Sequence, residues 1–215
     1  VSPAAGTDIH AWQAYLDQIG LTTLYPEVST IGYAARVPAW DKNAFIRDAN
    51  KSILPGYTIW PEETNRLEYF PVKLVAPFPA ETNWLGYDMG NDPERIAAAW
   101  IACESNSVAM TPKWRMAASN QLVDMVSMYL PVYAENLPHD KPYDRRLAVR
   151  GWVFARFPVN TLLDHVMEPQ QADIDFEVFD GSRLSEENLV FDYDQRLHFG
   201  NRDSGRIFSH TNALT

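Results

Sequence analysis

The chain has few of the residues and patterns that mark the commonest functional sites. Cys103 is the only cysteine among 215 residues, so no disulfide can form within the chain. Cys103 falls on the expected buried face of a helix, and we interpret it as an inert core residue rather than a reactive thiol. The cysteine count leaves the cellular compartment open.

Long apolar runs are also missing. The longest, Ile96–Cys103, is far shorter than the roughly 20 residues that cross a bilayer, and we expect it in the core. No charged segment followed by an apolar one begins the chain, so the sequence shows no signal peptide.

Basic residues are in the minority. Lysine and arginine number 18 against 28 acidic residues, a formal net charge of −10. This balance argues against a nucleic-acid surface, which needs a basic patch to neutralise phosphates. We attribute the acidity to solubility rather than to cation binding.

Signatures of catalysis and metal binding are absent. The sequence has no Gly-x-Ser-x-Gly elbow, phosphate-binding glycine loop or dinucleotide fingerprint. No two histidines have the spacing of metal ligands, and Asp173-x-Asp175 and Asp192-x-Asp194 are expected on solvated strand edges. We therefore predict no catalytic residue, metal or cofactor, and a protein that is not an enzyme. The five histidines are His10, His139, His165, His198 and His210.

The clearest secondary-structure patterns lie between Leu67 and Tyr133, and the rest of the chain is organised around this stretch. Alternation between Tyr69 and Ala76 predicts a strand, and Pro71 predicts that this strand lies at a sheet edge or begins at that residue. Asp92 and Pro93 fit the N-cap and first position of a helix. We expect its buried face to be formed by Ile96, Ala99, Trp100 and Cys103, with Glu94, Arg95 and Glu104 in water.

The same reasoning predicts elements along the rest of the chain. A helix with Ile9, Trp12, Leu16 and Ile19 on one face ends at Gly20, and another follows Asp41. A third opens at Pro158, and residues 134–146 are expected to form a surface loop. Strands are predicted at 31–37, 57–60, 107–111, 121–133, 147–157, 174–178, 189–193 and 206–209. This combination of predicted helices and strands indicates an α+β fold.

An ordered set of residues resembles the CHASE domain, the extracytoplasmic sensor module of bacterial receptors and plant cytokinin receptor kinases. The set is Tyr69-x-Pro71, Pro77, Asn83-x-Leu85-Gly86-Tyr87-Asp88, Pro93-x-Arg95, Ala102, Thr111, Pro131-Val132-Tyr133 and Gly151. The resemblance is strongest between Gly32 and Phe157. It implies two PAS-like lobes with antiparallel sheets: residues 1–31 end a stalk helix, 32–150 form the membrane-distal ligand-binding lobe and 151–215 the membrane-proximal lobe.

The resemblance also implies where a ligand binds. Asp88 matches the aspartate that accepts hydrogen bonds from the adenine part of cytokinin, and Met110, followed by Thr111, matches a pocket leucine. Another polar contact falls within Ala117–Gln121, where Asn120 or Gln121 fits. By strand phase Tyr87, Met125 and Tyr129 would form pocket walls, or ordinary core. From the residues alone, we favour Asp88 as an ordinary turn acid that accepts hydrogen bonds from nearby backbone N–H groups.

We therefore expect a small-molecule sensor domain from the periplasmic or extracellular part of a membrane receptor, tethered by segments outside this chain. The alternative is a module that senses a partner protein and has no small-molecule pocket. In the full receptor we expect a homodimer, paired through the Ile9, Trp12, Leu16 and Ile19 face of the stalk.

Overall fold

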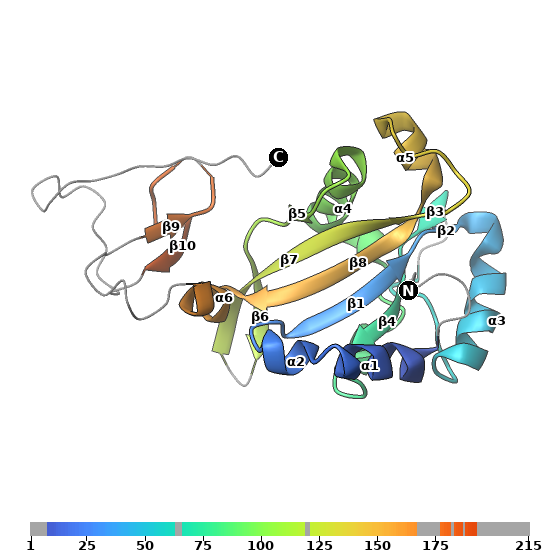
Figure 1. Ribbon diagram of the computed structural model, residues 1–215, viewed down its shortest axis with the longest axis horizontal. Coiled ribbons are helices and arrows are strands. Elements are labelled where there is room, and N and C mark those ends of the chain that lie inside the picture. Colours follow the sequence, from blue (N-terminus) through green and yellow to red (C-terminus); the bar gives the residue numbers. More distant parts are fainter. Residues whose placement is uncertain are drawn as a thin grey trace, which may run out of the picture.

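A six-stranded antiparallel sheet forms the centre of the domain in the computed structural model (Figure 1). The structure describes residues 8–62, 66–118, 121–166, 177–181, 183–186 and 188–192. The sheet follows the order β4-β1-β8-β7-β5, with β6 paired to β7 beside β5. These strands are β1 Thr30–Ala35, β4 Val72–Ala76, β5 Ala109–Met110, β6 Trp114–Ala118, β7 Gln121–Tyr133 and β8 Val149–Pro158.

Helices and two short strand pairs accompany this sheet. The α-helices are α1 Ile9–Gln18, α2 Leu21–Leu24, α3 Lys42–Ser52, α4 Pro93–Ser105, α5 Pro142–Ala148 and α6 Val159–Val166. Short 3₁₀ helices are η1 Ala39–Asp41, η2 Thr82–Trp84 and η3 Met89–Asn91. Two small antiparallel pairs join β2 Val37–Pro38 to β3 Glu68–Tyr69, and β9 Glu177–Phe179 to β10 Leu189–Asp192. The fold is thus α+β with antiparallel sheets, as the sequence predicts.

Local sequence explains the best-predicted elements. The bounds of β7 are those expected from its long apolar alternation. Asp92 caps α4 by accepting from two backbone N–H groups, and Pro93 opens the helix. Asp8 likewise caps α1, and Gly20 follows it with a positive φ of 66°. The edge position that Pro71 predicts is confirmed, since β4 ends the strand order.

The core lies where α1 and α4 meet the sheet. Ile9, Trp12 and Leu16 are buried, and α1 packs on β4, whose five residues are all buried. The face that we expected to pair two stalks is therefore used inside the domain, because only Ile19 of that set is exposed. A smaller cluster of Val126, Phe157, Val159 and Phe191 joins β7 and β8 to α6 and β10.

Strand β8 changes the expected organisation. It lies in the middle of the main sheet, hydrogen-bonded to β1 on one side and β7 on the other (Figure 1). A lobe boundary at Arg150 would cut through this strand, so the residues up to Pro158 belong to the same sheet as β1. The PAS-like character of the lobes stays a prediction.

Three local expectations differ from the structure. Residues 142–148 form α5 rather than loop, because Pro142 occupies a first helical turn, where proline is tolerated. Strand β6 was not expected, and residues 57–60 form only a bridge from Trp60 to Tyr87. The buried face of α4 is Arg95, Ala98, Ala99, Ala102 and Cys103, rotated from the expected one so that Arg95 faces inward.

Some expectations concern residues outside the described ranges. These are the strand at 206–209, the start of the strand at 174–178, Asn120, three members of the aspartate pairs (Asp173, Asp175 and Asp194), and two histidines (His198 and His210).

Candidate functional site

The segment that carries Asp88 is held between two others. Trp60 N–H donates to the Gly86 carbonyl and Asp88 N–H donates to the Trp60 carbonyl. On the opposite side, Met89 N–H donates to Phe70 O. Gly86 has a φ of 80°, and a Cβ there would lie 1.9 Å from Thr58 O, so only glycine allows this close approach.

The Asp88 carboxylate is fully buried and serves the turn that follows it. Its Oδ1 accepts from the backbone N–H groups of Phe70 at 2.8 Å and Gly90 at 3.0 Å. Its Oδ2 accepts no hydrogen bond within the described part of the chain and lies 3.5 Å from Nη1 of Arg66. These contacts fix η3 against Phe70 and so set where α4 begins.

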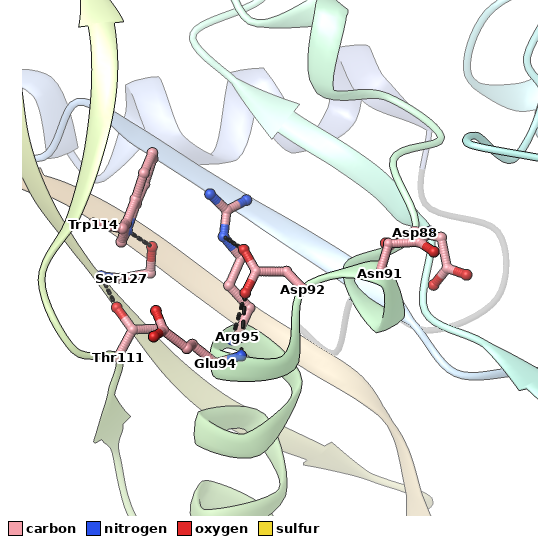
Figure 2. A network of polar contacts seen from close by, with 8 residues as sticks. All are labelled: Asp88, Asn91, Asp92, Glu94, Arg95, Thr111, Trp114 and Ser127. Carbon is pink, nitrogen blue, oxygen red and sulfur yellow. Dashed lines mark hydrogen bonds and ion pairs between the residues drawn. The ribbon is translucent and has the colours of Figure 1, made fainter. Parts of the chain in front are cut away.

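Arg95 projects from the first turn of α4 into the interior. Its Nε lies 2.9 Å from Asp92 Oδ2, an ion pair without hydrogen-bond alignment (Figure 2). The guanidinium carbon lies 4.4 Å from the ring centre of Trp114, 5.1 Å from that of Trp84 and 5.7 Å from that of Tyr87. Arg95 is only 9% exposed. Cation–π contacts of this kind strengthen when they are removed from water.

A polar row crosses the sheet beside Arg95. Thr30, Arg156 and Ser127 are partners in the registers of β1, β8 and β7, so their side chains share one face. All three are buried. Arg156 donates through Nη2 to Thr30 and Glu81, and its guanidinium carbon lies 4.2 Å from the ring centre of Trp84. Burial lowers the pKa of Arg156, and the neighbouring Glu81 partly offsets this effect.

Several predicted site residues meet near Arg95. Tyr87 contacts it directly. Thr111 accepts from Ser127 N–H at 3.1 Å, and Trp114 donates to Ser127 Oγ at 3.2 Å (Figure 2). Tyr129 shares the face of Ser127 and is buried, which raises the pKa of its phenol, while nearby Arg95 opposes that rise.

Other predicted residues lie elsewhere or are only partly described. Asp88 lies apart from the Arg95 group in Figure 2. Its neighbour Tyr87 contacts Arg95, and successive side chains of an extended segment point to opposite sides. Met110 packs in the cluster on the other face of the sheet, with Val126 and Phe157. Met125 is fully buried and pairs in register with Trp114. Gln121 begins β7.

Neither Arg95 nor Arg156 is expected at this site from the sequence pattern. Arg95 was assigned to solvent because helix periodicity treats arginine as a surface residue. One pattern in the sequence points to Arg156. Trp152, Phe154 and Arg156 occupy every second position of β8 and so share one face with two large aromatic side chains. We name Arg95, Arg156, Trp84, Trp114 and Tyr87 the arginine–aromatic cluster.

Side chains fill this part of the interior. Trp84 contacts Tyr87 with ring centres 5.4 Å apart, and Arg95 contacts both of these rings. A cavity between α1, α2 and β1, lined by residues such as Leu16, Leu21 and Ile31, measures about 10 Å³, enough for about one water molecule. A bound molecule would require side chains of the cluster to move.

Within the residues described, no three His, Cys, Asp or Glu side chains are grouped as a metal site. The described part of the chain also contains no helix with the length and apolar character needed to cross a membrane.

Comparisons with known proteins identify the family. The CHASE domain matches residues 6–191, most of the chain, and the chain therefore belongs to the CHASE domain family. CHASE domains are extracytoplasmic sensor modules of signalling receptors. No curated protein matches the chain.

Among solved structures, one titled methyl-accepting chemotaxis protein X is similar, with 16% sequence identity and a TM-score of 0.33. The match covers 74% of this chain and 49% of that one, so this chain spans about half of its length.

Proposed function

We propose that this domain senses a small molecule that binds between α4 and the main sheet, at the arginine–aromatic cluster. One observation supports this most strongly: the interior there contains two buried arginines, although buried charges cost stability that apolar side chains of similar size would not. Polar groups held among aromatic walls are typical of small-molecule sites.

The predicted ligand residues Tyr87, Thr111, Met125 and Tyr129 lie in or beside this region. Thr111 and Tyr129 supply hydroxyl groups, and Tyr87 and Met125 supply apolar surface. Asp88 has a positioning role in this proposal, through η3 and the start of α4. Its direct contact with a cytokinin-like ligand stays a prediction, as do contributions from Met110, Asn120 and Gln121.

In this proposal the domain faces the periplasm or the extracellular space, and parts of the receptor outside this chain anchor it and carry the output. Homodimerisation in the full receptor would use a surface other than the buried face of α1.

A thermal-shift screen of purines, amino acids and small acids tests the proposal. A ligand present at about 100 times its dissociation constant stabilises the folded state by about 2.7 kcal/mol. We expect a hit whose shift falls in Tyr129→Phe or Thr111→Val. Tyr143→Phe is the matched control, because Tyr143 is 71% exposed.

The alternative is a module that recognises a partner protein. It is favoured by the packing of the cluster, where side chains now occupy the space that a ligand would need. Receptor signalling that responds to a partner protein, with no shift from any small molecule, would support this alternative and contradict the pocket.

A further inference from the structure

Arg156 has hydrogen-bond donors that the described residues leave unmatched. It is only 3% exposed, yet its Nε and Nη1 have no hydrogen-bond partner there. Its contacts with Thr30 and Glu81 both use Nη2. A guanidinium carries five N–H donors and no acceptor. Buried donors are nearly always satisfied in folded proteins, so these indicate an acceptor other than the residues that the structure describes.

Arg95 brings a second positive charge to the same place. Both guanidinium groups lie against the ring of Trp84, with their central carbons 4.2 Å and 5.1 Å from its centre. They are close enough for Arg95 to contribute to the lowered pKa of Arg156, after burial as the main cause. Two like charges in a dry interior favour an anion between them.

The acids already present limit the charge of that anion. Asp92 pairs with Arg95 and Glu81 pairs with Arg156, but the acids are the more exposed partners: 29% and 26% of their side chains are exposed, against 10% and 4% for the arginines. Water therefore screens the acids more than the arginines, so the site attracts one negative charge, whereas the second charge of a phosphate meets more repulsion from the two acids. Since uncompensated buried charge is expensive, the monoanion is favoured over the dianion.

The walls indicate the rest of the ligand. Trp84, Trp114 and Tyr87 present flat apolar rings around the arginines. Trp114 is half-buried and begins β6, which among the described strands pairs only with β7. Its movement would open the cluster to a small organic molecule.

We propose that the arginine–aromatic cluster binds a small organic carboxylate, whose oxygens accept hydrogen bonds from Arg156 and Arg95 while its apolar part contacts the rings of Trp84 and Trp114. This inference rests on the proposed sensor function and specifies the chemical class of its ligand. Charge-assisted hydrogen bonds to a carboxylate are about twice as strong as neutral ones.

Binding of matched acids and amides tests the inference. The probes are acetate and benzoate, each beside its amide, with the dianion succinate and inorganic phosphate for comparison. Tryptophan fluorescence and thermal shift report binding, since two tryptophans line the site. We expect at least one carboxylate to bind and its amide to bind tenfold to hundredfold more weakly, because the amide lacks the charge.

Variants locate the binding. Arg156→Gln should weaken carboxylate affinity by tenfold or more. If the single variant does not fold, the double variant Glu81→Gln with Arg156→Gln removes both charges of the ion pair and leaves no unpaired buried acid. It should show the same loss of carboxylate affinity. Arg150→Gln is the matched control, because Arg150 lies on the same strand but is exposed, and it should bind as the unaltered domain does.

Several results would overturn the inference. They are equal binding of acid and amide, binding of phosphate alone, or an equal loss in Arg150→Gln and Arg156→Gln. A purine or another neutral molecule that binds and loses affinity in Tyr129→Phe, while no carboxylate binds, would leave the sensor proposal standing and refute the carboxylate. No binding by any compound would refute both.

Discussion

Replacing Asp88 separates a structural acid from a ligand-binding one. In Asp88→Ala, the backbone N–H groups of Phe70 and Gly90 lose their shared acceptor. Each hydrogen bond to a charged group contributes about 1.5–3 kcal/mol. The two together give an expected loss of about 3–6 kcal/mol, a large part of the 5–15 kcal/mol that typically stabilises a folded protein.

Asp88→Asn is the matched variant. The asparagine oxygen can still accept from both N–H groups, but as a neutral acceptor it forms weaker bonds. The amide nitrogen would replace Oδ2, which lies 3.5 Å from Arg66 Nη1, and so would lose that ion pair. We expect a loss of about 1–3 kcal/mol, between the unaltered domain and Asp88→Ala.

Equilibrium unfolding in urea measures both losses. With a slope near 2 kcal/mol per molar urea, Asp88→Ala should lower the midpoint by roughly 1.5–3 M. A loss below about 1 kcal/mol for Asp88→Ala would refute the structural role. If ligand affinity then fell in Asp88→Asn, the carboxylate would be a binding group, as the resemblance to cytokinin receptors implies.

Three further perturbations test the packing. Gly86→Ala should cost about 1–3 kcal/mol more than Gly56→Ala in urea unfolding, because both glycines have positive φ but only Gly86 meets a backbone oxygen. The Cys103 thiol is buried, which raises its pKa, so a thiol reagent should react only as fast as the domain unfolds; rapid reaction with the folded domain would contradict this burial. Burial also raises the pKa of Tyr57, so stability should fall above about pH 10 by about 1.4 kcal/mol per pH unit for this residue. The fall should be smaller in Tyr57→Phe.

The elements that sequence predicts best have strong local determinants. Asp92 and Pro93 specify the start of α4 through groups within one turn of each other. Thirteen residues of β7 contain enough apolar alternation to fix both of its ends. Such features depend on neighbours in the chain, which a sequence displays directly.

Elements with weak local determinants were missed. Strand β6 is short and contains two adjacent alanines, and its pairing depends on β7, which returns beside it. Helix α5 lies among charged residues and proline, where helix and loop have similar compositions. Arg145 fastens α5 by donating to the Glu104 carbonyl of α4, a contact between segments 41 residues apart.

The site depends even more on distant contacts. Tyr87 and Asp88 are adjacent and were assigned to one pocket, but an extended backbone sends them to opposite sides. Only Tyr87 contacts Arg95. The alternation of β7 predicts that Tyr129 faces inward. It does not predict that Arg95 and Arg156 lie near its hydroxyl group.

Arg156 shows which features of the site can be predicted from the sequence and which cannot. It lies two and four residues after Phe154 and Trp152, and this spacing is sufficient to place an arginine on a buried face of β8. What that arginine meets is a separate matter, because Glu81 and Thr30 lie 75 and 126 residues away along the chain. Those two acceptors engage only one of its nitrogens, which becomes visible once β1, β8 and η2 are placed together in space. A buried charge can thus be predicted from periodicity, while its incomplete pairing, on which the proposed carboxylate binding rests, is a property of the tertiary structure.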